Sequence, residues 1–203
     1  YAEDSYSPYA NQSYPTNVYW GDTHLHTNLS ADANIFGNKK LGIEEAYRFA
    51  KGESVKAHNG MEARLNRPLD FLVVADHATN MGVLNVLEAG NPSLLRWAKA
   101  KFWQSELKRA KATKGKEKPN ETNYSQFKLA FLSQKVGDEK FDQSVWQSVT
   151  ALADKHNEPG LFTAFIGYEW TAIFNLHRVV MFRDDASKAN NILPFSRFDS
   201  NNP

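Results

Sequence analysis

The sequence predicts an α/β fold, because two strongly apolar strands are separated by amphipathic helices. Residues 71–75 form a continuous apolar run between two aspartates, and residues 161–171 form a second strand of the same kind. A strand covered on both faces of a sheet has this pattern. Residues 92–111 and 141–156, which lie between the two strands, carry apolar side chains near helical spacing, so we expect helices there.

The first quarter of the chain is predicted to contain an arm, a strand, a loop and a helix. Residues 1–17 are rich in Tyr, Ser, Asn and Pro without any period, which favours an extended arm. Residues 18–24 begin with β-forming side chains and predict a short strand. Residues 28–41 are rich in Asn, Asp, Ala and Gly and are expected to form a loop. Residues 42–50 predict a helix, which Gly52 ends.

Three segments in the middle of the chain have more than one interpretation. Residues 54–65 are compatible with a short strand or a loop around His58, which we interpret as a surface histidine, with a substrate contact as the alternative. Residues 113–125 predict a solvated linker. The basic stretch 108–118 is interrupted by an acidic residue and lacks interleaved aromatic rings, so a solvated helix end is favoured over a nucleic-acid patch.

The end of the chain is predicted to hold one further strand. His156 lies in the last turn of the second predicted helix, where the helix dipole favours a cation, so we interpret it as structural. Residues 175–182 predict the strand, and residues 184–203 are polar and rich in turn formers.

Length and composition indicate one globular domain. The 203 residues are 41% hydrophobic and 23% charged, which is ordinary for a globular protein that buries a core. We predict one domain over residues 18–203, with a helical insertion at about 85–158, after the arm at residues 1–17.

Charge and cysteine content exclude several classes of function. The net charge of +1 gives no global electrostatic argument for nucleic acid or for an anionic membrane as a partner. The absence of cysteine excludes disulfides, thiolate metal sites and a cysteine nucleophile. No apolar run approaches the ~20 residues of a membrane span. The start without Met is compatible with a processed, periplasmic or secreted protein or with an engineered boundary, and a cytoplasmic location stays open.

Two histidines at the end of the first predicted strand are candidate metal ligands. His24 and His26 are two residues apart, so on a regular strand both imidazoles point to the same face. A transition metal is a common occupant of such a position. Asp22 and Asp32 flank the pair, and each is a candidate ligand or a residue that orients an imidazole.

Further metal-type side chains lie at the ends of the other predicted strands. Asp76 and His77 follow the strand at 71–75, Glu169 lies near the end of the next strand, and His177 begins the last one. Because strand ends in an α/β fold converge on one rim, these residues can meet. Arg178 is a candidate to bind a phosphoryl or sulfuryl oxygen, with a solvent-facing arginine as the alternative.

The chemistry of this set favours two or three divalent metal ions. Imidazoles and carboxylates without thiolates suit Zn, Mn or Fe. If one carboxylate bridges two ions, the pair can hold an anionic ester and lower the pKa of a bound water, which then becomes the nucleophile. A neighbouring carboxylate or imidazole exchanges the proton, so Asp22 and Asp76 are catalytic candidates.

Three motifs together resemble the PHP superfamily, which is named after polymerase and histidinol phosphatase. They are Gly-Asp-Thr-His-Leu-His-Thr-Asn-Leu-Ser at 21–30, Leu-Asp-Phe-Leu-Val-Val-Ala-Asp-His at 69–77 and Gly-Tyr-Glu-Trp-Thr at 167–171. More narrowly, the chain resembles the domain-of-unknown-function family 3604, over most of residues 17–203. The resemblance implies a distorted (β/α)7 barrel with metals at its C-terminal rim, phosphoester hydrolysis, and His24, His26, His77, Glu169 and His177 as ligands.

The chain departs from the PHP pattern at its end. PHP proteins complete the metal site with later motifs, one or more His and then an Asp-x-His pair, and no His follows His177 here. We therefore expect an incomplete PHP-type barrel, whose site is completed by the remainder of a longer chain or by a second chain.

Three functions stay open at this point. The first is a metal-dependent hydrolase of a small phosphoester or related anionic ester. The second is a non-catalytic PHP-like module that binds metal or has a structural role. The third is hydrolysis of a neutral substrate by the same use of metal and water, as in amidohydrolase-type barrels.

Overall fold

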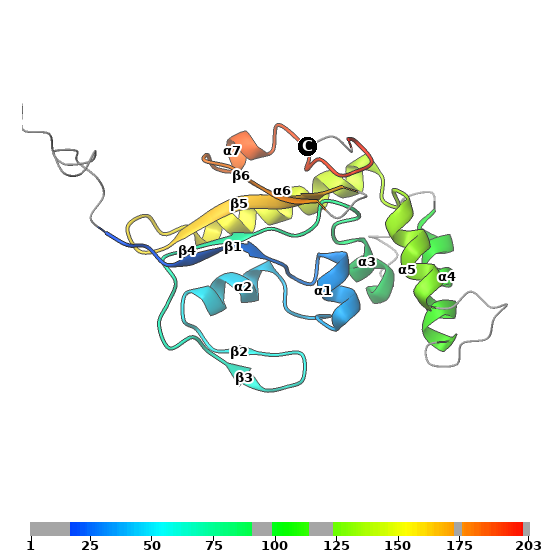
Figure 1. Ribbon diagram of the computed structural model, residues 1–203, viewed down its shortest axis with the longest axis horizontal. Helices are drawn as coiled ribbons and strands as arrows, with labels where there is room; N and C mark the ends of the chain where they lie inside the picture. The colour runs from blue at the N-terminus through cyan, green and yellow to red at the C-terminus, as the bar shows by residue number, and fades with distance from the viewer. Residues whose placement is uncertain (1–16, 91–98, 114–123, 173–175, 201–203) are drawn as a thin grey trace, which may run out of the picture.

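The protein has a mixed α/β fold built on one four-stranded sheet. The computed structural model describes residues 17–90, 99–113, 124–172 and 176–200 (Figure 1). The sheet has the order β1-β4-β5-β6, and a separate hairpin pairs β2 with β3. The strands are β1 (Gly21–Leu25), β2 (Val55–Lys56), β3 (Glu62–Ala63), β4 (Phe71–Val74), β5 (Thr163–Thr171) and β6 (His177–Met181). The α/β class is confirmed, and so are the strands predicted at 71–75 and 161–171.

Three neighbouring strands run in the same direction, and the fourth runs against them. β4 pairs in parallel with both β1 and β5, with Leu72 opposite Asp22 on one side and opposite Ala164 on the other. β6 pairs antiparallel with β5, and its register places His177 opposite Thr171. The carboxyl ends of β1, β4 and β5 therefore meet at one edge of the sheet, as the sequence predicts.

Seven helices are described, and two of them cover one face of the sheet. They are α1 (Ala31–Phe36), α2 (Ile43–Ala50), α3 (Val83–Ala89), α4 (Ala100–Thr113), α5 (Tyr124–Ser133), α6 (Glu139–His156) and α7 (Ala186–Ala189). Tyr47 of α2 and Trp146 of α6 are buried with Leu72 and Ile166 of the sheet in one core cluster. Because side chains alternate along a strand, the odd-numbered residues of β5 point to the opposite face.

Four of the other helices gather beyond the carboxyl ends of the parallel strands. Figure 1 shows α1, α3, α4 and α5 at this end of the sheet. They enclose a second core cluster, in which Trp103 of α4 packs edge-on against Phe127 and Phe131 of α5. Helices α3 and α5 were not predicted individually from the sequence. The helix expected at 92–111 is observed from Ala100, and residues 91–98 and most of the expected linker lie outside the described residues.

The prediction of a loop at residues 28–41 is wrong in part, because residues Ala31–Phe36 form α1. Ser30 precedes the helix in an extended conformation and Asp32 lies in its first turn, both of which favour a helix start. Gly37 ends it at a φ of 123°, a conformation that glycine adopts without strain. Ala31 is buried in the second core cluster, so tertiary packing holds this short helix despite its loop-like composition.

Two other local predictions agree with the structure. The helix expected at 42–50 is α2, and the ambiguous segment 54–65 forms the small hairpin. The polar segment 184–203 contains one short helix, α7. The arm expected at 1–17 lies almost wholly outside the described residues. No described helix combines the length and the hydropathy needed to cross a membrane.

Candidate metal centre

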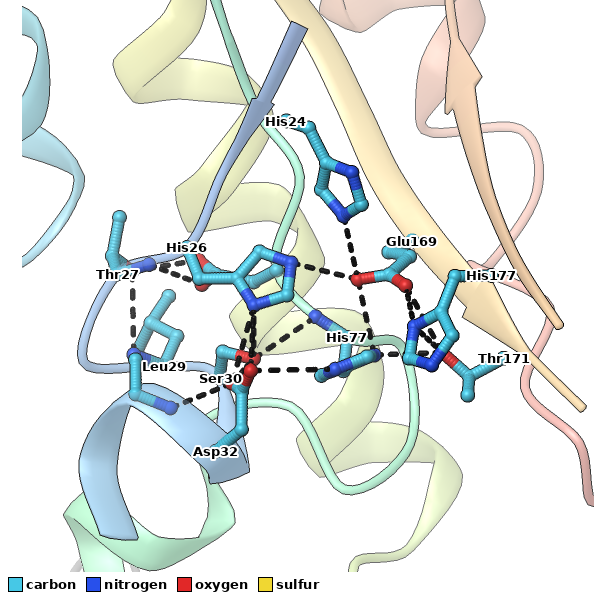
Figure 2. Close-up of polar contacts among 12 residues, drawn as sticks. His24, His26, Thr27, Leu29, Ser30, Asp32, His77, Glu169, Thr171 and His177 are labelled. Atoms are coloured by element: carbon cyan, nitrogen blue, oxygen red, sulfur yellow. Dashed lines mark hydrogen bonds and ion pairs between the residues drawn. The ribbon is translucent and has the colours of Figure 1, made fainter. Parts of the chain in front are cut away.

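The side chains of His24 and His26 meet at one carboxylate. His24 lies in β1, and His26 follows the last residue of that strand. The Nε2 atom of His24 is 3.0 Å from Oε2 of Glu169, and Nε2 of His26 is 2.7 Å from the same oxygen (Figure 2). The expected convergence of the two imidazoles is therefore observed, although they lie at the irregular end of the β1–β4 pairing.

Glu169 is the centre of the cluster. Glu169 is fully buried, and its side chain lies on the face of β5 that α6 does not cover. His77 follows β4, and its Nδ1 is 3.3 Å from Glu169 Oε2. The ring of His177, from β6, contacts Oε1 of the same carboxylate through Nδ1. Four imidazoles from three strands or their ends thus surround one carboxylate.

Asp32 supplies a second carboxylate from the first turn of α1. Its Oδ2 is 3.0 Å from Nδ1 of His26 and 3.6 Å from Nε2 of His77. The Ser30 hydroxyl donates to Asp32 Oδ1 at 2.5 Å, and the Ala33 amide donates to the same oxygen at 2.6 Å. The unpredicted helix α1 is therefore what brings Asp32 to the histidines.

The charges in the cluster stabilise one another. Burial would lower the pKa of His26, but its contacts with Asp32 and Glu169 outweigh burial and raise this pKa to about 10. Burial would raise the pKa of Glu169, but its close contacts with the imidazoles of His26 and His24 outweigh burial and lower this pKa to about 2. The pKa of Asp32 is lowered well below its usual range, mainly by hydrogen bonds from His26 and His77 acting against burial. Both carboxylates are therefore ionised at neutral pH.

Three overlapping groups in the cluster could each hold a metal ion. The groups are His24–His26–Glu169, His26–Asp32–His77 and His77–Glu169–His177, and the possible ligand atoms of each lie within 4.8 Å of one another. His26, His77 and Glu169 each belong to two groups, so one residue can serve neighbouring ions. The nitrogen and oxygen donors, without thiolates, fit Zn, Mn or Fe.

One buried atom gives a separate indication that the cluster suits a cation. His26 Nε2 is buried and makes no hydrogen bond of acceptable geometry, although it contacts Glu169. A buried polar atom without a hydrogen bond is costly, and a bound metal ion would satisfy it.

Asp76 and Asp22, the predicted catalytic carboxylates, are placed differently from the ligand candidates. Asp76 is buried and accepts hydrogen bonds from the amide and hydroxyl of Thr27, at 2.5 Å and 2.6 Å. Burial raises the pKa of Asp76 to about 6, although these two hydrogen bonds oppose the shift. Asp22 accepts from the backbone amide of His24 at 2.8 Å. Both aspartates thus hold the backbone next to the histidines, and their catalytic roles stay predictions.

Arg178 lies beside the cluster in sequence but is directed elsewhere. The pairing of β6 with β5 places it opposite Trp170, on the other face from Glu169 and Thr171. Its predicted role in binding an ester oxygen stays a prediction.

The two remaining histidines lie outside the cluster. His58 is exposed in the turn between β2 and β3, as expected for a surface histidine. His156 is buried at the end of α6, and its ring stacks on that of Tyr47. Its Nε2 atom lies 3.0 Å from Oε2 of Glu44. This arrangement agrees with the structural role predicted for His156.

Sequence reasoning missed several polar residues that support the cluster. The hydroxyl of Thr171 is 2.7 Å from His77 Nδ1 and 3.4 Å from Glu169 Oε1. The hydroxyl of Ser30 accepts from the His77 amide at 3.3 Å. The available signal was position, because Thr171 is two residues after Glu169 on a strand and so shares its face. Such partners orient metal-binding side chains in known sites.

One family model matches most of the chain. The family model described as Protein of unknown function (DUF3604) matches residues 13–203. No curated protein and no solved structure matches the chain.

Proposed function

The chain belongs to the family of proteins of unknown function (DUF3604), whose description states no activity; starting from the site, we propose a metal-dependent hydrolase of a phosphoester or related anionic ester. The observation that carries this proposal is the set of three overlapping His/carboxylate groups around Glu169. Shared ligands favour ions close together, and closely spaced ions are suited to holding the attacking and leaving oxygens of an ester.

The positions of the ligands at the strand ends support our proposal of a PHP-type metal site. His26 and His77 follow the ends of adjacent parallel strands, and Glu169 lies near the end of the third. In α/β barrels and open sheets, ligands bind at these carboxyl ends. We propose two or three ions, Zn, Mn or Fe, with the predicted ligands His24, His26, His77, Glu169, His177 and Asp32.

The reaction we propose is hydrolysis of the ester, in which water displaces the alcohol. Divalent ions held by these residues would supply Lewis acidity, which would stabilise charge on an ester oxygen and promote the loss of a proton from water. Water oxygen bonds to phosphorus, the bond to the leaving oxygen breaks, and the leaving oxygen takes up one proton. Asp32 lies at the wall of an adjoining pocket that opens to solvent, so the proton that water loses can be exchanged with solvent through this pocket.

The chain's own residues hold the reacting geometry. Asp76 fixes the backbone between His26 and α1 through Thr27. Ser30 orients Asp32, and Thr171 orients His77. These contacts keep the imidazoles in place before substrate binds, and preorganised sites avoid reorganisation during the reaction.

A non-catalytic module is the second candidate. It is favoured by the direct imidazole–carboxylate contacts, since ion pairs with protonated histidines can stabilise the sheet edge without a metal. In that case, chelators would leave the stability of the protein unchanged.

The test combines metal analysis with hydrolysis of simple esters. The protein is purified, supplied with Mn²⁺ or Zn²⁺, and assayed with p-nitrophenyl phosphate, its diester and the sulfate. We expect bound metal, hydrolysis that chelation abolishes, and loss of both in His77→Ala. His58→Ala is the matched control, because it removes an exposed histidine outside the cluster. Bound metal without hydrolysis of any of these esters would reject the catalytic proposal, and absence of bound metal would reject the centre itself.

A further inference from the structure

A pocket of about 500 Å³ opens directly beside the cluster. Its polar side is made of side chains already described in the centre, which are Asp32, His77, Thr171 and His177. A molecule bound in this pocket would therefore contact the proposed ligands and their neighbours. A volume of this size accommodates a small organic ligand.

Most of the other residues that line the pocket are apolar, and several of these side chains are exposed to solvent. It includes Phe36 at the end of α1, which is 87% exposed, and Leu129 of α5, which is 72% exposed. Leu132, one turn further along α5, is 36% exposed, and Ile35 lies beside Phe36. Large apolar side chains gathered around a polar site are typical of a binding surface.

Two cations complete the pocket. Lys128 of α5 and Arg197 line it together with the apolar side chains. The guanidinium carbon of Arg197 also lies 5.2 Å from the centre of the Phe198 ring, a cation–π contact. Asp32 is the one carboxylate in the described lining, so Lys128 and Arg197 together leave the lining with a net positive charge. Arginine binds tetrahedral oxyanions by paired hydrogen bonds.

We propose that the substrate of this centre is an amphipathic anionic ester, in which a phosphoryl or sulfuryl group is joined to an aryl or long alkyl alcohol. The oxyanion lies between the histidine cluster and Arg197, and the apolar alcohol lies against Phe36 and Leu129. This inference rests on the proposed function and adds the class of the leaving group. Hydrolysis proceeds as described above and releases the apolar alcohol with one proton.

The first experiment compares leaving groups of different size on the metal-loaded protein. We expect kcat/KM for 1-naphthyl phosphate to exceed that for methyl phosphate far more than the intrinsic reactivity of the two esters explains. A long alkyl phosphate, whose reactivity matches that of methyl phosphate, separates pocket binding from leaving-group chemistry. Equal kcat/KM for the methyl and the long alkyl ester would overturn the inference and leave the proposed hydrolase intact. The corresponding sulfates distinguish the two oxyanions.

Matched substitutions locate the apolar wall. Leu129→Gln exchanges a pocket leucine for a polar side chain of similar length that helices tolerate. We expect KM for the long alkyl phosphate to rise about tenfold, with little change for methyl phosphate. Leu161→Gln is the control, since Leu161 is 78% exposed in the turn before β5 and outside the pocket. An equal effect of both variants would contradict the assignment.

A binding measurement keeps the inference testable without turnover. 1-Naphthylmethylphosphonate cannot be hydrolysed at the phosphorus–carbon bond, so its Kd is measured by calorimetry on the metal-loaded protein. We expect Arg197→Gln and Leu129→Gln each to weaken binding about tenfold, and Leu161→Gln to leave it unchanged. Binding of the phosphonate without hydrolysis of any ester would reject the proposed function but support the pocket. No binding by the wild-type protein would reject the pocket.

Discussion

Replacing Glu169 by glutamine tests the central feature of the site. The substitution keeps the size of the side chain but removes the charge that four imidazoles contact. Glu169 belongs to two of the three possible metal groups, so only the group His26–Asp32–His77 stays intact. We therefore expect Glu169→Gln to bind at most one ion. Asp32→Asn should show the reverse, with loss of that group and retention of the two that contain Glu169.

The expected size of the stability effect follows from mass action. A metal present at 100 times its Kd stabilises a protein by about 2.7 kcal/mol. For a chain of this length, this corresponds to a rise in Tm of about 5–11 °C, at about 2–4 °C per kcal/mol. We expect that rise for each bound ion, so the rise in Glu169→Gln, which retains at most one of the two or three ions, should be at most half of that in the wild-type protein. Metal content is measured by plasma mass spectrometry after desalting, and Tm by circular dichroism with and without a chelator.

The control for this experiment is Glu88→Gln. Glu88 is partly buried in α3, where it pairs with Lys39 and Lys111, and it lies outside the three groups. Its substitution removes a carboxylate that also pairs with two cationic side chains, without touching the cluster. Wild-type metal content in Glu169→Gln would refute the assignment of Glu169 as a shared ligand. A loss of metal in Glu88→Gln as large as that in Glu169→Gln would show that any lost carboxylate has this effect.

Three further predictions concern the residues that support the site and the core. Asp76→Ala leaves the buried amide of Thr27 without its acceptor, so the free energy of unfolding should fall by about 3 kcal/mol, measured by urea denaturation. An unchanged unfolding midpoint would contradict this. The pKa of Glu44 is lowered to about 2, and the hydrogen bond from Lys155 is the largest cause. Ionised Glu44 therefore stabilises the folded state above about pH 4.5, and this stabilisation is lost as the pH falls toward 2. Because Glu44 is about one-third exposed, Glu44→Gln should cost only about 1 kcal/mol at pH 7, and the difference from wild type should shrink below pH 4.5. Trp103→Ala removes a buried ring from the second core cluster and should cost about 3–5 kcal/mol by the same assay; a cost below about 1 kcal/mol would show that this cluster adds little.

Much of the sheet can be predicted from local sequence. The apolar run at Phe71–Val74 and the long β5 strand have patterns that any strand covered on both faces must have. The polar residues at their ends were then expected to meet, because parallel neighbouring strands end at the same edge. The structure brings His24, His26 and His77 to Glu169 in this way.

The helical part was predicted less well, and the reason is packing. Helix α1 has a loop-like composition, and only its contact with the second core cluster makes it a helix. Helix α5 has no clear separation of apolar and polar faces, and its Phe127 and Phe131 become core residues only by contact with Trp103. Local periodicity does not contain that information.

By itself, the sequence determined the α/β class, the absence of thiolate chemistry and the set of histidines and carboxylates at the strand ends. These follow from composition and from side-chain patterns that are local along the chain. Only the tertiary structure decided which way the polar residues point. It directs Asp76 to Thr27, turns Arg178 to the face opposite Glu169, and brings Arg197 from the end of the described chain into the pocket beside Asp32. The physical reason is that side-chain direction depends on strand register and on helices packed from distant parts of the chain, which no local pattern specifies.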